Sequence, residues 1–254
     1  MSPRPSTSPR SSQSLQLSDF DAVTFDVYGT LIDWEPSIIA FLRKWADQRA
    51  LAATDEELLM GFDRARAEIQ KERPAHLYPD VLRRCFDRIS GEFDVAVDAE
   101  EREAFAAAPH HWPAYPDSHQ GLMKLQQAAL VGALSNIDNA SLASSCGKLD
   151  FKFDLVVTAE RVGAYKPDWP HFHRAIEDLA ARGIPRERIL HVGQSLRADI
   201  TPANRLGLKC AWVNRPGREL GLSGEGAAEA KPDLTVASLR GLVDAIADGG
   251  KAVA

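Results

Sequence analysis

Two charged side chains stand where apolar, β-prone runs of the chain end. Asp26 follows the run AVTF, and Lys166 lies beyond the run at residues 155–157. Because an aspartate is already an anion near pH 7, Asp26 can attack a substrate without the neighbouring base that a serine needs. Lys166 supplies a compact positive charge that can keep Asp26 ionised and attract an anionic substrate. These two residues predict covalent catalysis with Asp26 as the nucleophile.

Polar groups occur after two further β-prone runs. Ser135, like Thr30 near Asp26, supplies a hydroxyl donor that can orient a substrate carboxylate. Asp199 is a candidate for activating a water molecule, and Gln194 is either an amide ligand or a hydrogen-bonding spacer. The same residue types also suit plain structural roles, since hydroxyls often stabilise turns and an aspartate often caps a helix.

The β-prone runs define the elements that must position these side chains. The run AVTFDV begins after Asp21, and similar runs follow at residues 131–134, 155–157, 189–192 and 210–213, separated by stretches of helical periodicity. This alternation predicts an α/β fold with a doubly wound parallel sheet. Ligands bind such sheets outside the carboxyl ends of the strands, so we expect the polar residues to meet there.

The chain divides into a core and an insertion. Residues 36–115 show helical periodicity alone, which predicts an all-helical cap between core segments 18–35 and 116–254. Residues 1–17 are rich in Ser, Pro and Arg and are expected to form a disordered leader, and the tail from Gly249 is expected to fray.

Four motifs carry a resemblance to a known family. The segments FDVYGTLID, ALSNID, YKPD around Lys166 and HVGQSLRADITPANRLG occur in the order and spacing of the four haloacid dehalogenase superfamily motifs. With Tyr28 two places after Asp26, the first motif resembles that of the L-2-haloacid dehalogenases (type II). The resemblance covers essentially the whole predicted core.

That resemblance implies a specific reaction. Asp26 would displace halide from a small 2-haloalkanoic acid, and water would then hydrolyse the resulting ester without a cofactor. Tyr28 would lie in the substrate site, and Asn136 would contact the departing halide. A cap arginine binds halide in these enzymes, which here implies Arg64 or Arg66, with Arg64 preferred.

Two alternatives stay open. A Mg²⁺-dependent phosphatase of the same superfamily would use Asp26 and Asp199 as metal ligands, but Tyr28 and Gln194 occupy positions where such enzymes carry acids. The segment GQS also stands where the dehalogenases have Ser-Ser-Asn. A catalytically silent binding protein on this fold is the third hypothesis.

Composition limits the remaining possibilities. A net charge of -6 provides no broad basic surface, which argues against nucleic acid and favours a small anionic substrate held by a few cations. The three cysteines, Cys85, Cys146 and Cys210, lack metal or disulfide spacing, and no apolar run suggests a membrane helix, so a cytoplasmic location is expected.

No zinc site is expected from the histidines, and His191 is expected to be a hydrogen-bonded core residue. Apolar cap faces make a homodimer possible.

Overall fold

A parallel sheet forms the centre of the molecule. The computed structural model describes residues 15–218 and 220–247, and within them six strands pair in the order β3-β2-β1-β4-β5-β6, all parallel. The strands are β1 (Ala22–Phe25), β2 (Leu130–Ser135), β3 (Leu155–Thr158), β4 (Ile189–Gly193), β5 (Lys209–Val213) and β6 (Leu234–Val236). The predicted doubly wound α/β sheet is confirmed, and β6 is an addition that the sequence patterns did not reveal.

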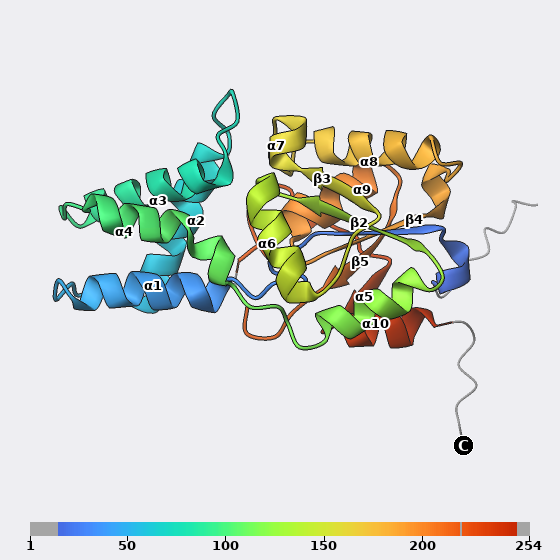
Figure 1. Cartoon of the computed structure of the whole chain (residues 1–254), viewed down its shortest axis with the longest axis horizontal. Coiled ribbons are helices and arrows are strands. Elements are labelled where there is room, and N and C mark those ends of the chain that lie inside the picture. Colours follow the sequence, from blue (N-terminus) through green and yellow to red (C-terminus); the bar gives the residue numbers. More distant parts are fainter. Residues whose placement is uncertain (1–14, 219, 248–254) are drawn as a thin grey trace, which may run out of the picture.

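Helices cover both faces of this sheet (Figure 1). Helices α8 (Pro170–Ala180) and α9 (Thr201–Arg205) pack on one face, where Phe172 and Ala203 join one apolar cluster. Helices α5 (Ser118–Gln126) and α10 (Leu239–Ile246) pack on the other face. The core also contains α6 (Asn139–Leu149), α7 (Ala159–Val162), a π-helical turn, η4 (Leu196–Ile200), and the 3-10 turns η1 (Leu17–Asp19), η3 (Arg186–Arg188) and η5 (Ala227–Glu229). Burial on both faces accounts for the nearly continuous apolar character of the strands.

Most of the chain between β1 and β2, from α1 to η2, forms the predicted helical cap, which lies apart from the sheet in Figure 1. Residues 36–115, all of them described, contain helices and no strand. The helices are α1 (Glu35–Asp47), α2 (Asp55–Ile69), α3 (Tyr78–Glu92), α4 (Ala99–Ala106) and the short η2 (Ala108–His111). Thr54 and Asp98 begin α2 and α4 with capping boxes. The division of the chain at residues 35 and 116 stays a prediction, although α1 begins beside the first of these positions.

The cap has an aromatic core of its own. Phe86 lies at ring-centroid distances of 5.0 Å from Phe105 and 5.5 Å from Trp45, and Phe41 lies 4.9 Å from Phe105. These rings come from α1, α3 and α4, so they tie the cap helices together.

At the amino-terminal end, residues 1–14 of the expected leader lie outside the described residues. Leu15 and Leu17 pack against the core, so the ordered chain begins before the predicted boundary at residue 18. The tail from Gly249 also lies outside the described residues. Among the described helices, none has the length and apolar character to cross a membrane.

Candidate active site

Asp26 lies immediately beyond the central strand β1. Its backbone N–H donates to Val192 O of β4 at 2.9 Å, which fixes the chain where the strand ends. Gly29 then adopts a φ of +98°, a backbone conformation that residues with a side chain rarely adopt, and the chain turns back. This turn brings Thr30 Oγ1 to Asp26 Oδ2, where the hydroxyl donates at 2.8 Å. The nucleophile candidate is therefore held by backbone and side chain before any substrate arrives.

Lys166 reaches the same point from the segment after α7. Its Nζ donates to Asp26 Oδ1 at 3.1 Å, to Asp199 Oδ1 at 2.6 Å and to Leu134 O at 2.7 Å. All three ammonium donors are thus used by buried acceptors. The structure brings together the three residues predicted to be catalytic, and we call Asp26, Lys166 and Asp199 the floor of the site.

The floor carries one net negative charge when both carboxyls are ionised, because one ammonium serves two carboxylates. Burial raises the pKa of Asp26 to about 6, against the opposing effect of Lys166. The pKa of Asp26 therefore lies closer to neutral pH than that of an ordinary carboxyl group. Burial also opposes ionisation of Asp199, but Lys166 and His191 outweigh it and hold that pKa at about 2.

Several predicted substrate contacts are already occupied within the protein. Besides donating to Asp26, the Thr30 hydroxyl accepts from the Gln194 backbone N–H at 2.9 Å. Asn136 clamps the backbone of Lys166, accepting from its N–H at 2.6 Å and donating to its carbonyl at 2.9 Å. The Gln194 side-chain amide donates to Leu220 O. Thr30 and Asn136 therefore hold floor residues in place, whereas the Gln194 side chain is held by the backbone at Leu220.

The other two predicted substrate contacts, Tyr28 and Ser135, do not hold the floor. Tyr28 lines the cavity, but its hydroxyl lies 2.7 Å from Ser145 Oγ of α6 and 3.3 Å from Ser141 O. Burial raises the pKa of Tyr28 strongly. Ser135 Oγ is buried without a hydrogen-bond partner among the described residues, and Ser135 is not among the residues that line the cavity.

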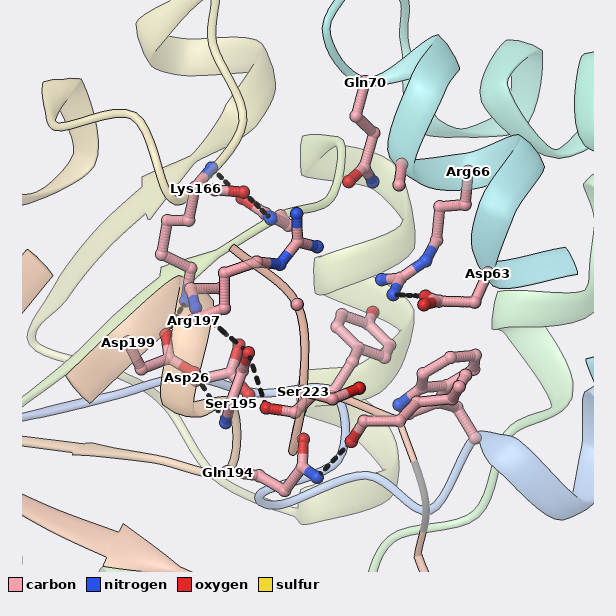
Figure 2. A pocket seen from close by; sticks show the side chains of 18 of the residues that line it. Asp26, Asp63, Arg66, Gln70, Lys166, Gln194, Ser195, Arg197, Asp199 and Ser223 are labelled. Carbon is pink, nitrogen blue, oxygen red and sulfur yellow. Dashed lines mark hydrogen bonds and ion pairs between the residues drawn. The ribbon is translucent and has the colours of Figure 1, made fainter. Parts of the chain in front are cut away.

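A cavity of about 370 Å³ opens above the floor, between core and cap. Both predicted cap arginines border it. The Arg64 side chain is 61% exposed and pairs with Glu92, whereas that of Arg66 is 17% exposed and pairs with Asp63 inside the cavity (Figure 2). Arg66 also lies over the Trp34 ring, 5.3 Å from its centroid. The inward guanidinium therefore belongs to Arg66 rather than to the preferred Arg64.

Arg197 and Gln70 are among the residues of this cavity that sequence reasoning missed. Arg197 lies two residues before Asp199 in the strand-end segment after β4, a position that could have marked it for inspection. Gln70 follows Arg66 by four residues, the spacing that places two side chains on one helical face.

The histidines near the floor are structural. His191 is buried in β4 with Nδ1 3.0 Å from Thr24 Oγ1, which confirms the expected core histidine. Its Nε2 lies 3.5 Å from Asp199 Oδ1. His171 places Nε2 3.1 Å from Ser135 O, and burial lowers its pKa to about 3. Neither imidazole borders the cavity.

The floor is a poor fit for Mg²⁺. No group of three or more His, Cys, Asp or Glu residues suited to a metal occurs in the described part of the chain. Both floor carboxylates already bind Lys166, and the nearby Gln194 is a neutral amide. A hard cation would have to compete with the ammonium for two carboxylates alone.

Comparison with known proteins gives the family. A family model described as haloacid dehalogenase-like hydrolase matches residues 20–207. This match covers well over half of the chain, and the chain belongs to the haloacid dehalogenase-like hydrolases.

Individual relatives carry different activities. The 5-amino-6-(5-phospho-D-ribitylamino)uracil phosphatase YigB of Escherichia coli K12 is 30% identical over 210 residues, 78% of this chain and 84% of the relative. The pyrimidine 5'-nucleotidase YjjG of the same organism is 39% identical over 90 residues, 35% of this chain and 36% of the relative. The L-2-haloacid dehalogenase of Xanthobacter autotrophicus has a TM-score of 0.71 at 21% identity, covering 88% of this chain and 96% of that chain. The last likeness shows the fold alone.

Proposed function

We propose that this hydrolase cleaves the carbon–halogen bond of a small 2-haloalkanoic acid through an ester on Asp26. The observation that carries the proposal is the poor supply of protons beside the nucleophile. Burial raises the pKa of Tyr28, and the two floor carboxylates raise that of Lys166 despite its burial. In the first step a halide departs as a stable anion without protonation, whereas the alkoxide that leaves a phosphate ester in the first step of a phosphatase benefits from a general acid.

The charge of the floor favours the same reaction. A phosphate group about 4 Å from ionised Asp26 would be repelled by roughly 1 kcal/mol per charge in water-like surroundings and about 4 kcal/mol at intermediate dielectric. A haloacid brings an uncharged carbon to Asp26 and carries a single negative charge elsewhere. Repulsion by the floor is therefore smaller for a haloacid.

The reaction proceeds in two steps that balance. An Asp26 oxygen attacks C2 of the haloacid, the new C–O bond forms as the C–halogen bond breaks, and halide leaves with the bonding electrons. Water then attacks the Asp26 carboxyl carbon, the bond between that carbon and the oxygen that Asp26 gave to the substrate breaks, and one proton of the water goes to that oxygen. The products are a 2-hydroxy acid, halide and one proton, and Asp26 is regenerated with one oxygen from water.

The roles of the other residues follow from their contacts. Lys166 and Thr30 hold the two Asp26 oxygens and are assigned to orient the nucleophile. Asp199 is fully buried, and its Oδ2 accepts from the Ser195 N–H while Oδ1 binds Lys166. We therefore assign Asp199 to positioning Lys166, in place of the water activation expected from the sequence.

Halide release tests the proposal directly. The protein should release chloride from 2-chloropropionate at a rate that EDTA does not change. In heavy-oxygen water, a single turnover with excess enzyme should add one heavy oxygen to the peptide that contains Asp26. Chloride release without label in that peptide would overturn the ester mechanism.

A Mg²⁺-dependent phosphatase is the second candidate, favoured by the 30% identity to YigB over most of both chains. The measurement is phosphate release from p-nitrophenyl phosphate with and without Mg²⁺, run beside the chloride assay. Phosphate release that requires Mg²⁺, together with no chloride release, would replace the first proposal with this one.

A further inference from the structure

Two arginines from different parts of the fold face the same cavity. Arg66 reaches in from α2 of the cap, and Arg197 reaches in from the π-helical turn η4 of the core. Figure 2 shows their guanidinium groups extending toward each other, with Gln70 beside them. We call Arg66, Gln70 and Arg197 the arginine wall.

The donors of this wall are incompletely satisfied. Arg66 Nε and Gln70 Nε2 are buried without a hydrogen-bond partner among the described residues. Arg197 forms no hydrogen bond or ion pair with any described residue, although its side chain is partly buried. Unpaired buried donors are costly, which indicates that an acceptor belongs there.

The charges of the wall are also unbalanced. Asp63 neutralises Arg66 through their ion pair, whereas Arg197 has no ion pair within the described part of the chain and feels Asp63 and Glu225 only at longer range. Burial and the nearby Arg66 lower the pKa of Arg197, which reflects the repulsion between two neighbouring cations. The cavity therefore has a negative floor and a positive wall. An anionic substrate lowers its electrostatic energy by turning its charge toward the wall and its uncharged carbon toward Asp26.

We propose that the arginine wall is an anion-binding site, in which Arg197, Arg66 and Gln70 hold the carboxylate of the substrate. This inference rests on the proposed function and deepens it, because it moves carboxylate recognition from the strand-end hydroxyls to the wall. The Thr30 hydroxyl already donates to Asp26, and Ser135 is not among the residues that line the cavity, so we assign the substrate carboxylate to neither. The guanidinium groups provide planar donors that suit a carboxylate.

The dimensions of the cavity extend the substrate class. A volume of about 370 Å³ falls within the range of sites that enclose whole small ligands, so an acid longer than propionate fits. The cavity also borders a second one of about 300 Å³, and Arg197 and Gln70 line both. We therefore take pentanoate as the unreactive probe.

The test compares pentanoate with pentanamide, which has nearly the same shape and no charge. Calorimetry should give the wild-type protein at least about tenfold higher affinity for pentanoate. In Arg197→Gln this ratio should fall to about threefold or less, and Arg197→Lys should restore part of it. Arg64→Gln, on the same cap helix as Arg66 but paired with Glu92 at the surface, is the matched control and should keep the wild-type ratio.

Two results would overturn the inference. One is a pentanoate preference that survives Arg197→Gln unchanged in a protein with wild-type thermal stability. The other comes from a second arm with inorganic phosphate, because a phosphate affinity that requires Mg²⁺ and is independent of Arg197 would place the substrate anion at Asp26. Failure of the proposed function is separate, since absent halide release with an Arg197-dependent pentanoate preference would refute dehalogenation and leave the anion site standing.

Discussion

The floor and the arginine wall of one cavity are built in opposite ways. In the floor, each donor of Lys166 has an acceptor, and both oxygens of Asp26 are held. In the wall, buried nitrogens of Arg66 and Gln70 lack acceptors within the part of the chain that the structure describes. The difference shows which part of the site is complete in the protein alone and which part is completed by a ligand.

This contrast also separates two demands of catalysis. A nucleophile must be oriented before the reaction, because fixed groups need no rearrangement in the transition state. A recognition site must leave donors open, because their hydrogen bonds are made to the substrate. Changes to the floor should therefore alter turnover and stability, whereas changes to the wall should alter affinity.

The largest effect is expected from Asp26→Asn. An amide cannot form the ester, so turnover should fall by roughly 10³-fold or more. Since burial raises the pKa of Asp26 to about 6, replacing the charged group with a neutral one should leave the melting temperature equal or higher. Steady-state halide release and a thermal melt check both outcomes. Turnover near the wild-type rate would remove Asp26 from the chemistry.

The next largest effect is expected from Lys166→Met. This change leaves two buried carboxylates without their shared ammonium, so the free energy of unfolding should fall by about 3–5 kcal/mol. Urea denaturation measures it. Lys148→Met is the control, because Lys148 donates to Pro109 O alone and is only partly buried, and it should cost far less. Equal losses in the two variants would contradict the contrast between floor and surface.

A smaller effect is expected from pH. Asp26 must be ionised to attack, so kcat/KM should fall about tenfold for each pH unit below the pKa of about 6. The folded protein should tolerate this change, because a carboxyl pKa above its unfolded value means that protonation of Asp26 favours the fold as the pH falls. Circular dichroism at pH 5 provides the control. A rate that stays constant down to pH 4.5 would show that Asp26 keeps an ordinary pKa.

The smallest effect is expected from Arg64→Gln. Its ion pair with Glu92 is largely exposed, so the stability should change by less than about 0.5 kcal/mol. KM for a haloacid should stay within about twofold of the wild-type value. A large rise in KM would return substrate binding to Arg64 and weaken the division between wall and surface.

The sequence was sufficient to predict five of the six strands and the three residues of the floor. Carboxyl ends of parallel strands meet at one edge, and that rule brings Asp26 and Lys166 together from 140 residues apart. Strand β6 escaped prediction because it has three residues, with an exposed Thr235 between half-buried neighbours, and shows no apolar run.

The wall was harder to predict, because it depends on how the cap lies against the core. Apolar periodicity shows which face of α2 is buried, and Arg66 follows the buried Phe62 by four residues on that face. This signal could have separated Arg66 from Arg64. No local pattern, however, states that Arg197 of the core lies opposite that face, since this contact depends on packing between distant segments.

The π-helical turn Leu196–Ile200 positions one side chain in the floor and another in the arginine wall. Ser195 O accepts from both Asp199 N–H and Ile200 N–H, so this turn contains one residue more than a regular α-helical turn. This geometry places Asp199 in the floor and Arg197 in the wall. Deletion of one residue from this turn should convert it into a regular helical turn and move either Asp199 or Arg197 away from the cavity. The length of this turn therefore links the support of the nucleophile to the recognition of the substrate.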